Sequence, residues 1–178
     1  NPDVILKDNA IENFFLSIAK NENFGIIAPV SKNEIYKNFN IDLDKNIKEV
    51  ENVKGFAMFL NMKKFENIGF FDENFFFYFE EIDLCKRLQN NNIKIFIDPL
   101  IEVSHLGGTS HNEEINKPME LSRNWHWMWS SFYFYKKNFN FRYAVKIMYG
   151  KFFRSLFKMI FFRIFYNKKK FTMYYARF

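Results

Sequence analysis

FEEIDLCKRLQNNNIKIFIDP, residues 79–99, contains the helix and the strand that decide the fold. Acidic residues occupy the first turn of the expected helix, and Lys86 and Arg87 stand nearer its end, which matches the helix dipole. The asparagines at 90–92 end the helix, and the apolar run that follows is typical of a buried strand. A helix that leads directly into a strand predicts an α/β domain.

The flanking segments continue this alternation of helices and strands. We expect helices over residues 8–21, with Asp8 as the N-cap, and 62–69, ended by Gly69, and strands over residues 24–30, 53–61 and 101–106. From Pro118 the pattern is helical to near the C-terminus. The prediction is therefore an α/β domain over residues 1–117, followed by a helical tail over residues 118–178.

The two ends of the chain differ sharply in charge. Residues 1–120 carry 13 Lys and Arg against 20 Asp and Glu, a net charge of −7, whereas residues 121–178 carry 13 basic residues and no acid. The whole chain therefore has a formal net charge of +6. An acidic body with a basic, aromatic tail indicates that the partner of the tail is an anionic surface.

Within the tail, Lys151, Arg154 and Lys158 fall on one helical stripe, and apolar residues fall mainly opposite. This pattern is typical of a helix in a lipid headgroup layer, so we expect residues 141–178 to bind an anionic membrane surface. One alternative is a helical pair that packs on the domain with its cations in water. A nucleic-acid interface is the least supported alternative, because no RNA-binding signature is present, and we expect no nucleic-acid partner.

Cysteine content and hydropathy bear on the compartment. The only cysteine, Cys85, excludes an intramolecular disulfide and fits a reducing compartment. The longest run without charge, Asn124–Tyr135, has 12 residues, against about 20 for a transmembrane helix. We therefore expect a cytoplasmic protein that associates peripherally with the inner face of the cytoplasmic membrane.

The acids at the start of the 79–90 helix admit two interpretations. Negative side chains in a first turn are each favoured by about 0.3–1 kcal/mol, which would be a purely structural role. The surrounding phenylalanines, however, lower the local dielectric, and a carboxylate held there can act as a general base. His105 ends the second strand after this helix, and the lengths of the intervening elements allow it to approach Glu81. His111 and His126 are assigned no role.

Three motifs in order resemble a known family: Gly55 before an apolar strand, the block FFDENFFFYFEEIDLCKR, and HLGGTS. Together, over about residues 53–110, they are similar to the acceptor-side half of family 2 glycosyltransferases of the GT-A fold, especially the bacterial rhamnosyltransferase-like branch. NPDV at residues 1–4 resembles the metal-binding motif of the same branch. The resemblance implies that residues 1–117 are the C-terminal part of a Rossmann-like GT-A catalytic domain.

The resemblance also implies a metal-dependent, inverting transferase. Asp3 and His105 would bind Mg²⁺ or Mn²⁺ at the diphosphate of the sugar donor, with Asn1 at the first position of the metal motif. Glu81 would be the catalytic base that removes the proton from the acceptor hydroxyl. The family usually has Asp at this position, so the carboxylate of Glu81 extends one methylene farther.

Neighbouring residues receive supporting roles. By the resemblance, Gly55, Asp72 and Glu80 would contribute to acceptor binding. Asp83 and Arg87 are four residues apart on one helix, so we expect them to form an ion pair.

The function implied is transfer of a sugar, with rhamnose as the leading candidate, from a nucleoside-diphosphate sugar to a saccharide or lipid-linked saccharide in cell-surface polysaccharide synthesis. In the family, the nucleotide-binding half precedes the NPDV motif, with which this chain begins. We therefore expect little turnover from these residues alone, and a sheet that exposes an edge or an apolar face. The alternative is a non-catalytic remnant that binds a membrane surface or a partner subunit.

Overall fold

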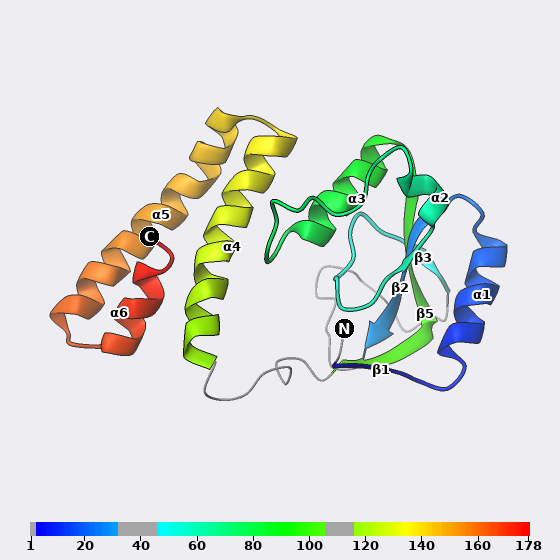
Figure 1. The fold of residues 1–178 in the computed structure, drawn as a ribbon, viewed down its shortest axis with the longest axis horizontal. Coiled ribbons are helices and arrows are strands. Elements are labelled where there is room, and N and C mark those ends of the chain that lie inside the picture. The colour runs from blue at the N-terminus through cyan, green and yellow to red at the C-terminus, as the bar shows by residue number, and fades with distance from the viewer. Residues whose placement is uncertain (1–2, 32–45, 106–115) are drawn as a thin grey trace. The chain divides into compact units, whose positions relative to one another are not determined.

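The computed structural model describes residues 3–31, 46–105 and 116–178 (Figure 1). The chain divides into two compact units. The sheet unit comprises Asn1–Asp72 and Glu81–Ser110, and the helical unit comprises Glu73–Glu80 and His111–Phe178. The helical unit is therefore formed by two separate segments of the chain, and the second part of the sheet unit lies between them in the sequence. The predicted boundary after residue 117 stays a prediction.

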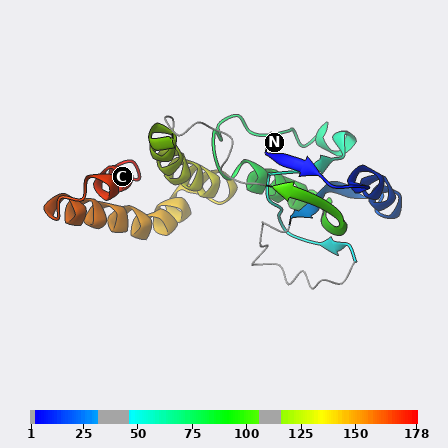
Figure 2. The same cartoon turned by 90° about the horizontal axis from the view of Figure 1, so that it is seen from below.

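A mixed sheet forms the centre of the sheet unit (Figures 1 and 2). Its strands are hydrogen-bonded in the order β1-β5-β2-β4, and β3 also pairs with β5. β2 and β5 run parallel, whereas the other pairs are antiparallel. The elements of this unit are β1 (Val4–Leu6), α1 (Ala10–Lys20), β2 (Phe24–Ser31), β3 (Lys48–Glu49), β4 (Phe59–Leu60), α2 (Met62–Phe65), α3 (Glu80–Asn90) and β5 (Lys94–His105).

Helices cover both faces of this sheet. Leu84 and Leu88 of α3 belong to one buried cluster with Ile26 of β2. Phe14 of α1 belongs to a second cluster with Ile27, the next residue of the same strand. Because successive residues of a strand point to opposite faces, the continuous apolar run of β2 supplies both clusters. The predicted α/β fold class is confirmed.

An apolar surface is exposed at the edge of the sheet unit, as predicted. Ile5 and Leu6 of the edge strand β1 are 59% and 48% exposed, and Phe15 of α1 is 63% exposed. β1 is an edge strand of the described sheet, because it stands at the end of the strand order and pairs there with β5 alone.

Three local predictions were wrong. Of the strand expected over residues 53–61, only Phe59–Leu60 forms a strand, β4. Asp8 is not the N-cap of α1: this position belongs to Asn9, which has a φ of +64° and makes no side-chain capping bond. The amide of Ala10 instead donates to the carbonyl oxygen of Lys7 at 3.0 Å, so a tight backbone turn starts the helix. The two strands expected over residues 93–106 form the single strand β5. Its pairing with β2 shifts between Asp98 and Glu102, an interval that contains Pro99, a residue without an N–H donor.

The helical unit contains three helices in its described part, namely α4 (Asn116–Asn138), α5 (Phe141–Ile164) and α6 (Lys168–Tyr175). α4 and α5 form an antiparallel pair, and α6 folds back beside them (Figure 1). Asn140 and Asn167 cap α5 and α6, since their side chains accept backbone N–H bonds. The helical pattern expected after Pro118 is confirmed. Across the described residues, no helix is both long and apolar enough to span a bilayer.

The aromatic segment 73–80 belongs to the helical unit because it packs on α4. Ser130 Oγ donates a hydrogen bond to the carbonyl oxygen of Phe77 at 2.6 Å. The ring of Phe79 lies 5.2 Å from the ring of Phe134, measured between centroids. The residues that lead into α3 are therefore held by α4, which lies far away in the sequence. Local periodicity does not predict this contact.

Arg87 ties α3 to the loop that precedes it. Its Nε is 2.9 Å from Asp83 Oδ2, one helical turn earlier, and its terminal nitrogens donate to the carbonyl oxygens of Ile68, Gly69 and Phe70. Asp83 is fully buried, so its negative charge depends on this guanidinium for compensation. The predicted Asp83–Arg87 pair is confirmed, and the three loop contacts are additional.

We expect Arg87→Met to lower the free energy of unfolding by about 3 kcal/mol, because the buried carboxylate of Asp83 loses its counter-charge. The double variant Asp83→Asn with Arg87→Met should recover part of this loss, since no charge is then left buried. Urea unfolding of the single and double variants tests this, with Lys86→Met as the matched control for removal of a neighbouring cation. A single variant as stable as the wild type would contradict it.

Candidate functional site

The pairing of β1 with β5 brings together the two residues predicted to bind a metal. Val4 pairs with His105, so Asp3, directly before β1, reaches the imidazole. Asp3 Oδ2 lies 3.4 Å from His105 Nε2, and the two side chains are 9% and 13% exposed. Within the described part of the chain, Asp3 Oδ1 is buried and has no hydrogen-bond partner. The pair is therefore preformed and largely shielded from water.

Two contacts hold His105 in place. Its ring stacks on the ring of Phe56 at a centroid distance of 5.0 Å and an interplanar angle of 11°. Its backbone N–H donates to Ser31 Oγ at 3.3 Å. Phe56 is itself buried, so it forms a rigid platform for the imidazole. Sequence reasoning missed both contacts, because one Phe among 26 and a single Ser carry no distinguishing pattern.

Gly55 lies against Glu81, the predicted catalytic base. A methyl group in place of one α-hydrogen of Gly55 would be 3.5 Å from Glu81 Cβ and 3.8 Å from its carboxyl carbon. The absence of a side chain therefore leaves space beside this carboxylate. Since Phe56 follows Gly55, this dipeptide contacts both Glu81 and His105.

The structure thus joins four sequence-predicted residues, Asp3, Gly55, Glu81 and His105, through one series of contacts in the sheet unit. Asp72, predicted to help bind the acceptor, is half-buried in the loop between α2 and α3 of the same unit.

The remaining predicted positions differ in what the structure describes. Glu80 is the first residue of α3, and its Oε2 is buried without a hydrogen-bond partner in the described ranges. Glu80 is assigned to the helical unit and Glu81 to the sheet unit. Asn1 and His111 lie outside the described residues. His126 packs against the ring of Phe76 in the helical unit.

A carboxylate oxygen and an imidazole nitrogen at this distance suit a divalent cation, and the unbonded Asp3 Oδ1 offers a further ligand atom. Among the described residues, no group of three or more His, Cys, Asp or Glu side chains could hold a metal. Asp3 and His105 would therefore be the acidic and imidazole ligands that the described residues offer to a cation here. Its other positions would be open to phosphate and water oxygens, as is usual for Mg²⁺.

Cys85 stands one helical turn after Glu81 and is fully buried. Burial raises the pKa of its thiol, a backbone hydrogen bond at Val53 lowers it, and the negative charge of Glu81 raises it further, to a value of about 11. Because Cys85 is the only cysteine, its titration can be followed without a second thiol.

We expect Glu81→Gln to lower the pKa of Cys85, because the variant removes a negative charge that opposes thiolate formation. The Cβ chemical shift of ¹³C-labelled Cys85, followed by NMR as a function of pH, measures this shift. Glu80→Gln is the matched control, and it should leave the titration unchanged. Equal titrations of Cys85 in the wild type and in Glu81→Gln would contradict this expectation.

The same raised pKa predicts how stability depends on pH. The unfolded thiol has a pKa near 9.0, below that of the folded thiol, so its contribution is complete below pH 9 and is lost as the pH rises toward 11. We expect wild type to lose about 2–3 kcal/mol more than Cys85→Ala across this window. Urea unfolding at both ends of the window compares the two proteins, and parallel losses would contradict the expectation.

No protein-family model matches the chain. The chain is 27% identical over 142 residues to the low-salt glycan biosynthesis hexosyltransferase Agl10 of Haloferax volcanii, a match that covers 69% of this chain and 43% of that protein. The chain therefore spans less than half the length of the curated relative. Over more than two thirds of its own length, it is similar in sequence to a hexosyltransferase.

Proposed function

We propose that this chain is the metal-binding and acceptor-side part of an inverting glycosyltransferase. The reaction is transfer of a sugar from a nucleoside-diphosphate donor to a saccharide or lipid-linked saccharide in cell-surface glycan synthesis, with rhamnose as the leading sugar. The observation that carries the proposal is the series of contacts joining Asp3, His105, Phe56, Gly55 and Glu81. The similarity to a hexosyltransferase supports it independently. We assign the chain to the family 2 GT-A enzymes on its motifs.

Glu81 is proposed as the general base. Its carboxylate accepts the proton of the acceptor hydroxyl as that oxygen attacks the anomeric carbon, and a single displacement inverts the configuration. Its position at the start of a helix that is anchored by Arg87 keeps the carboxylate in place. Gly55 leaves room for the acceptor sugar beside it, and Asp72 and Glu80 are proposed to orient that sugar.

Asp3 and His105 are proposed to bind Mg²⁺ or Mn²⁺. The cation would neutralise the charge that develops on the departing nucleoside diphosphate. Phe56 restricts rotation of the imidazole, so that Nε2 stays directed toward Asp3. Ser31 holds the backbone of His105 in the same register.

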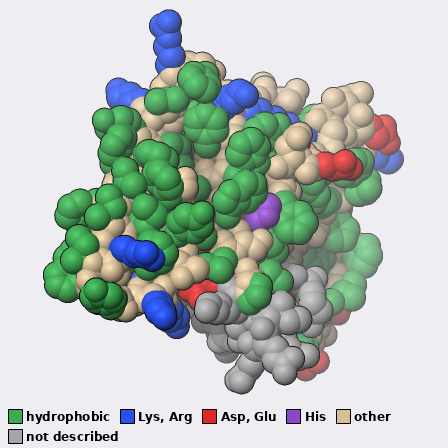
Figure 3. Space-filling model, turned by 60° about the vertical axis from the view of Figure 1, so that its left-hand side comes forward, with side chains coloured by type: hydrophobic (Ala, Val, Ile, Leu, Met, Phe, Trp, Pro, Cys, Tyr) green, Lys and Arg blue, Asp and Glu red, His purple; other side chains and the backbone are tan. Residues whose placement is uncertain are grey.

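Residues 141–178 are proposed to lie on the anionic inner surface of the cytoplasmic membrane. Basic and apolar side chains are interspersed on the helical unit (Figure 3). Phe157 of α5 is 70% exposed, and Tyr166, in the turn after α5, is 91% exposed. Large apolar side chains exposed among cations favour the interfacial layer of a membrane.

We expect Glu81→Gln to reduce the turnover number by at least about 100-fold in the full-length product of the reading frame, with donor binding unchanged, because only proton removal is lost. Glu51→Gln, an exposed glutamate of the same unit, is the matched control. Transfer from a set of nucleoside-diphosphate sugars, followed by mass spectrometry, measures both. Transfer by Glu81→Gln near the wild-type rate rules out Glu81 as the base.

A separate prediction concerns the metal. Asp3→Asn and His105→Ala should each weaken Mn²⁺-dependent binding of a nucleoside diphosphate by about tenfold or more, whereas His126→Ala should not. Isothermal titration calorimetry with and without Mn²⁺ measures this. Binding that is the same in all variants contradicts the metal assignment.

A full-length protein that binds no nucleotide, performs no transfer and still binds anionic vesicles supports the non-catalytic alternative.

A further inference from the structure

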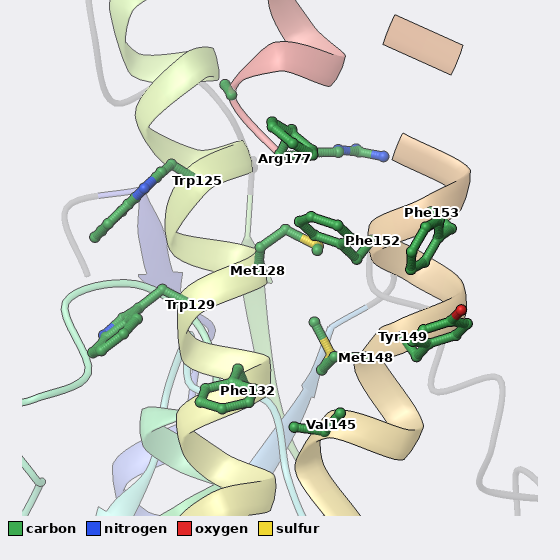
Figure 4. Close-up of a pocket in the computed structure, with 12 residues that line it drawn as sticks. Trp125, Met128, Trp129, Phe132, Val145, Met148, Tyr149, Phe152, Phe153 and Arg177 are labelled. Atoms are coloured by element: carbon green, nitrogen blue, oxygen red, sulfur yellow. The ribbon is translucent and has the colours of Figure 1, made fainter. Parts of the chain in front are cut away.

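The helical unit contains an open apolar cavity of about 440 Å³ between α4, α5 and the C-terminal residues (Figure 4). A cavity of this size is in the range of small-molecule sites. Twelve side chains line it, and Arg177 is the single charged residue among them. Representative lining residues are Trp125, Met128, Trp129, Met148, Phe152 and Phe178.

The rim of this cavity leaves large apolar side chains in water. Trp125 and Trp129 of α4 are 52% and 46% exposed, and Tyr149 and Phe153 of α5 are 60% and 46% exposed. Covering apolar surface is worth roughly 25 cal/mol for each Å² removed from water. An apolar ligand that fills the cavity would therefore bind favourably.

A second, polar cavity of about 280 Å³ lies in the same unit. It is lined by two guanidinium groups, one exposed carboxylate, one side-chain amide and two aromatic side chains. The residues that line it are Tyr78, Glu120, Arg123, Asn124, Trp127 and Arg177.

Arg177 lines both cavities, so they adjoin. Its side chain is held in place, because Nε donates to Asn124 Oδ1 at 2.5 Å and the guanidinium lies 5.6 Å from the ring centroid of Tyr174. One guanidinium thus marks the boundary between an apolar and a polar compartment. A ligand that fills both must have an apolar chain joined to a polar head.

The charge of the polar cavity selects the sign of that head. Within the described ranges, neither Arg123 nor Arg177 forms an ion pair with a carboxylate. Glu120 offsets one of the two positive charges but is exposed. Residues 121–178 contain no acid. Guanidinium groups bind carboxylates and phosphates through charge-assisted, often bidentate hydrogen bonds, so an anionic head, such as a phosphate, suits this cavity.

We propose that the helical unit binds a lipid phosphate, with its aliphatic chain in the apolar cavity and its phosphate between Arg123 and Arg177. This is a defined site for one lipid molecule, distinct from general attraction of the basic tail to a membrane surface. Tyr78 of the polar cavity precedes Glu81 by three residues in the chain. If the proposed transferase function holds, the site would hold the lipid end of the acceptor.

Binding of dodecyl phosphate below its critical micelle concentration tests the proposal without any transfer reaction. All three tryptophans, Trp125, Trp127 and Trp129, line the two cavities, so tryptophan fluorescence of the whole 178-residue chain reports occupancy. We expect saturable binding of dodecyl phosphate. Dodecanol at the same concentrations should bind at least about tenfold more weakly, and inorganic phosphate weaker still, because each lacks one half of the ligand.

Matched variants separate the site from nonspecific effects. Arg123→Gln and Arg177→Gln should each weaken binding by about tenfold, whereas Arg142→Gln, which removes an exposed arginine of α5 outside both cavities, should leave it unchanged. Val145→Phe should also weaken binding by partly filling the apolar cavity, and Ile160→Phe, on α5 outside the cavity, should not. Circular dichroism confirms that each variant is folded.

Three results would overturn the proposal. The first is no saturable binding of dodecyl phosphate by the folded wild type. The second is equal binding of dodecyl phosphate by the two arginine variants and by Arg142→Gln, which would leave only nonspecific attraction to a cationic surface. The third is sedimentation of the free chain as a dimer that Val145→Phe dissociates and dodecyl phosphate does not, since a second copy would then occupy the groove.

Discussion

The antiparallel pairing of β1 with the last residues of β5 is the constraint on which the candidate site depends. It sets Val4 opposite His105, so Asp3 and the imidazole lie on the same end of the sheet. A shift of one residue in this register would turn one of the two side chains to the other face. β5 cannot shift easily, because it lies between β1 and β2 and its apolar side chains are buried on both faces. The strands thus position a pair of polar side chains that no local sequence holds in place.

Gly55 and Phe56 connect this pair to the rest of the site. The ring of Phe56 stacks on the imidazole, while Gly55, which has no side chain, lies against Glu81. Glu81 in turn belongs to a helix whose preceding loop is held by Arg87 through three carbonyl oxygens. Each polar group of the site therefore rests on a buried or multiply bonded neighbour, which is the arrangement that keeps reacting groups in a fixed geometry.

The helical unit contributes more than a basic surface. Tyr78 and Phe79 both have positive φ values, +67° and +70°. This conformation costs roughly 1–3 kcal/mol for each residue other than glycine. α4 compensates for this strain, because Ser130 binds the carbonyl oxygen of Phe77 and Phe134 packs against Phe79. The backbone that enters α3 at Glu80 is thus shaped by the helical unit, which also contains the proposed lipid site. Lipid binding and the start of α3 share one structural unit.

The sequence by itself determined the features that depend on nearby residues: the helix over residues 79–90, the Asp83–Arg87 pair, the helical tail and the division of charge. It also pointed to Asp3, Glu81 and His105 through the order of motifs, and their catalytic and metal-binding roles stay predictions. Only the tertiary structure decided the cap of α1, the single strand β5, the support of His105 by Phe56 and Ser31, and the position of Arg177 between two cavities. These features join residues far apart in the chain, and which of 26 phenylalanines meets a given imidazole depends on strand register and packing rather than on local periodicity.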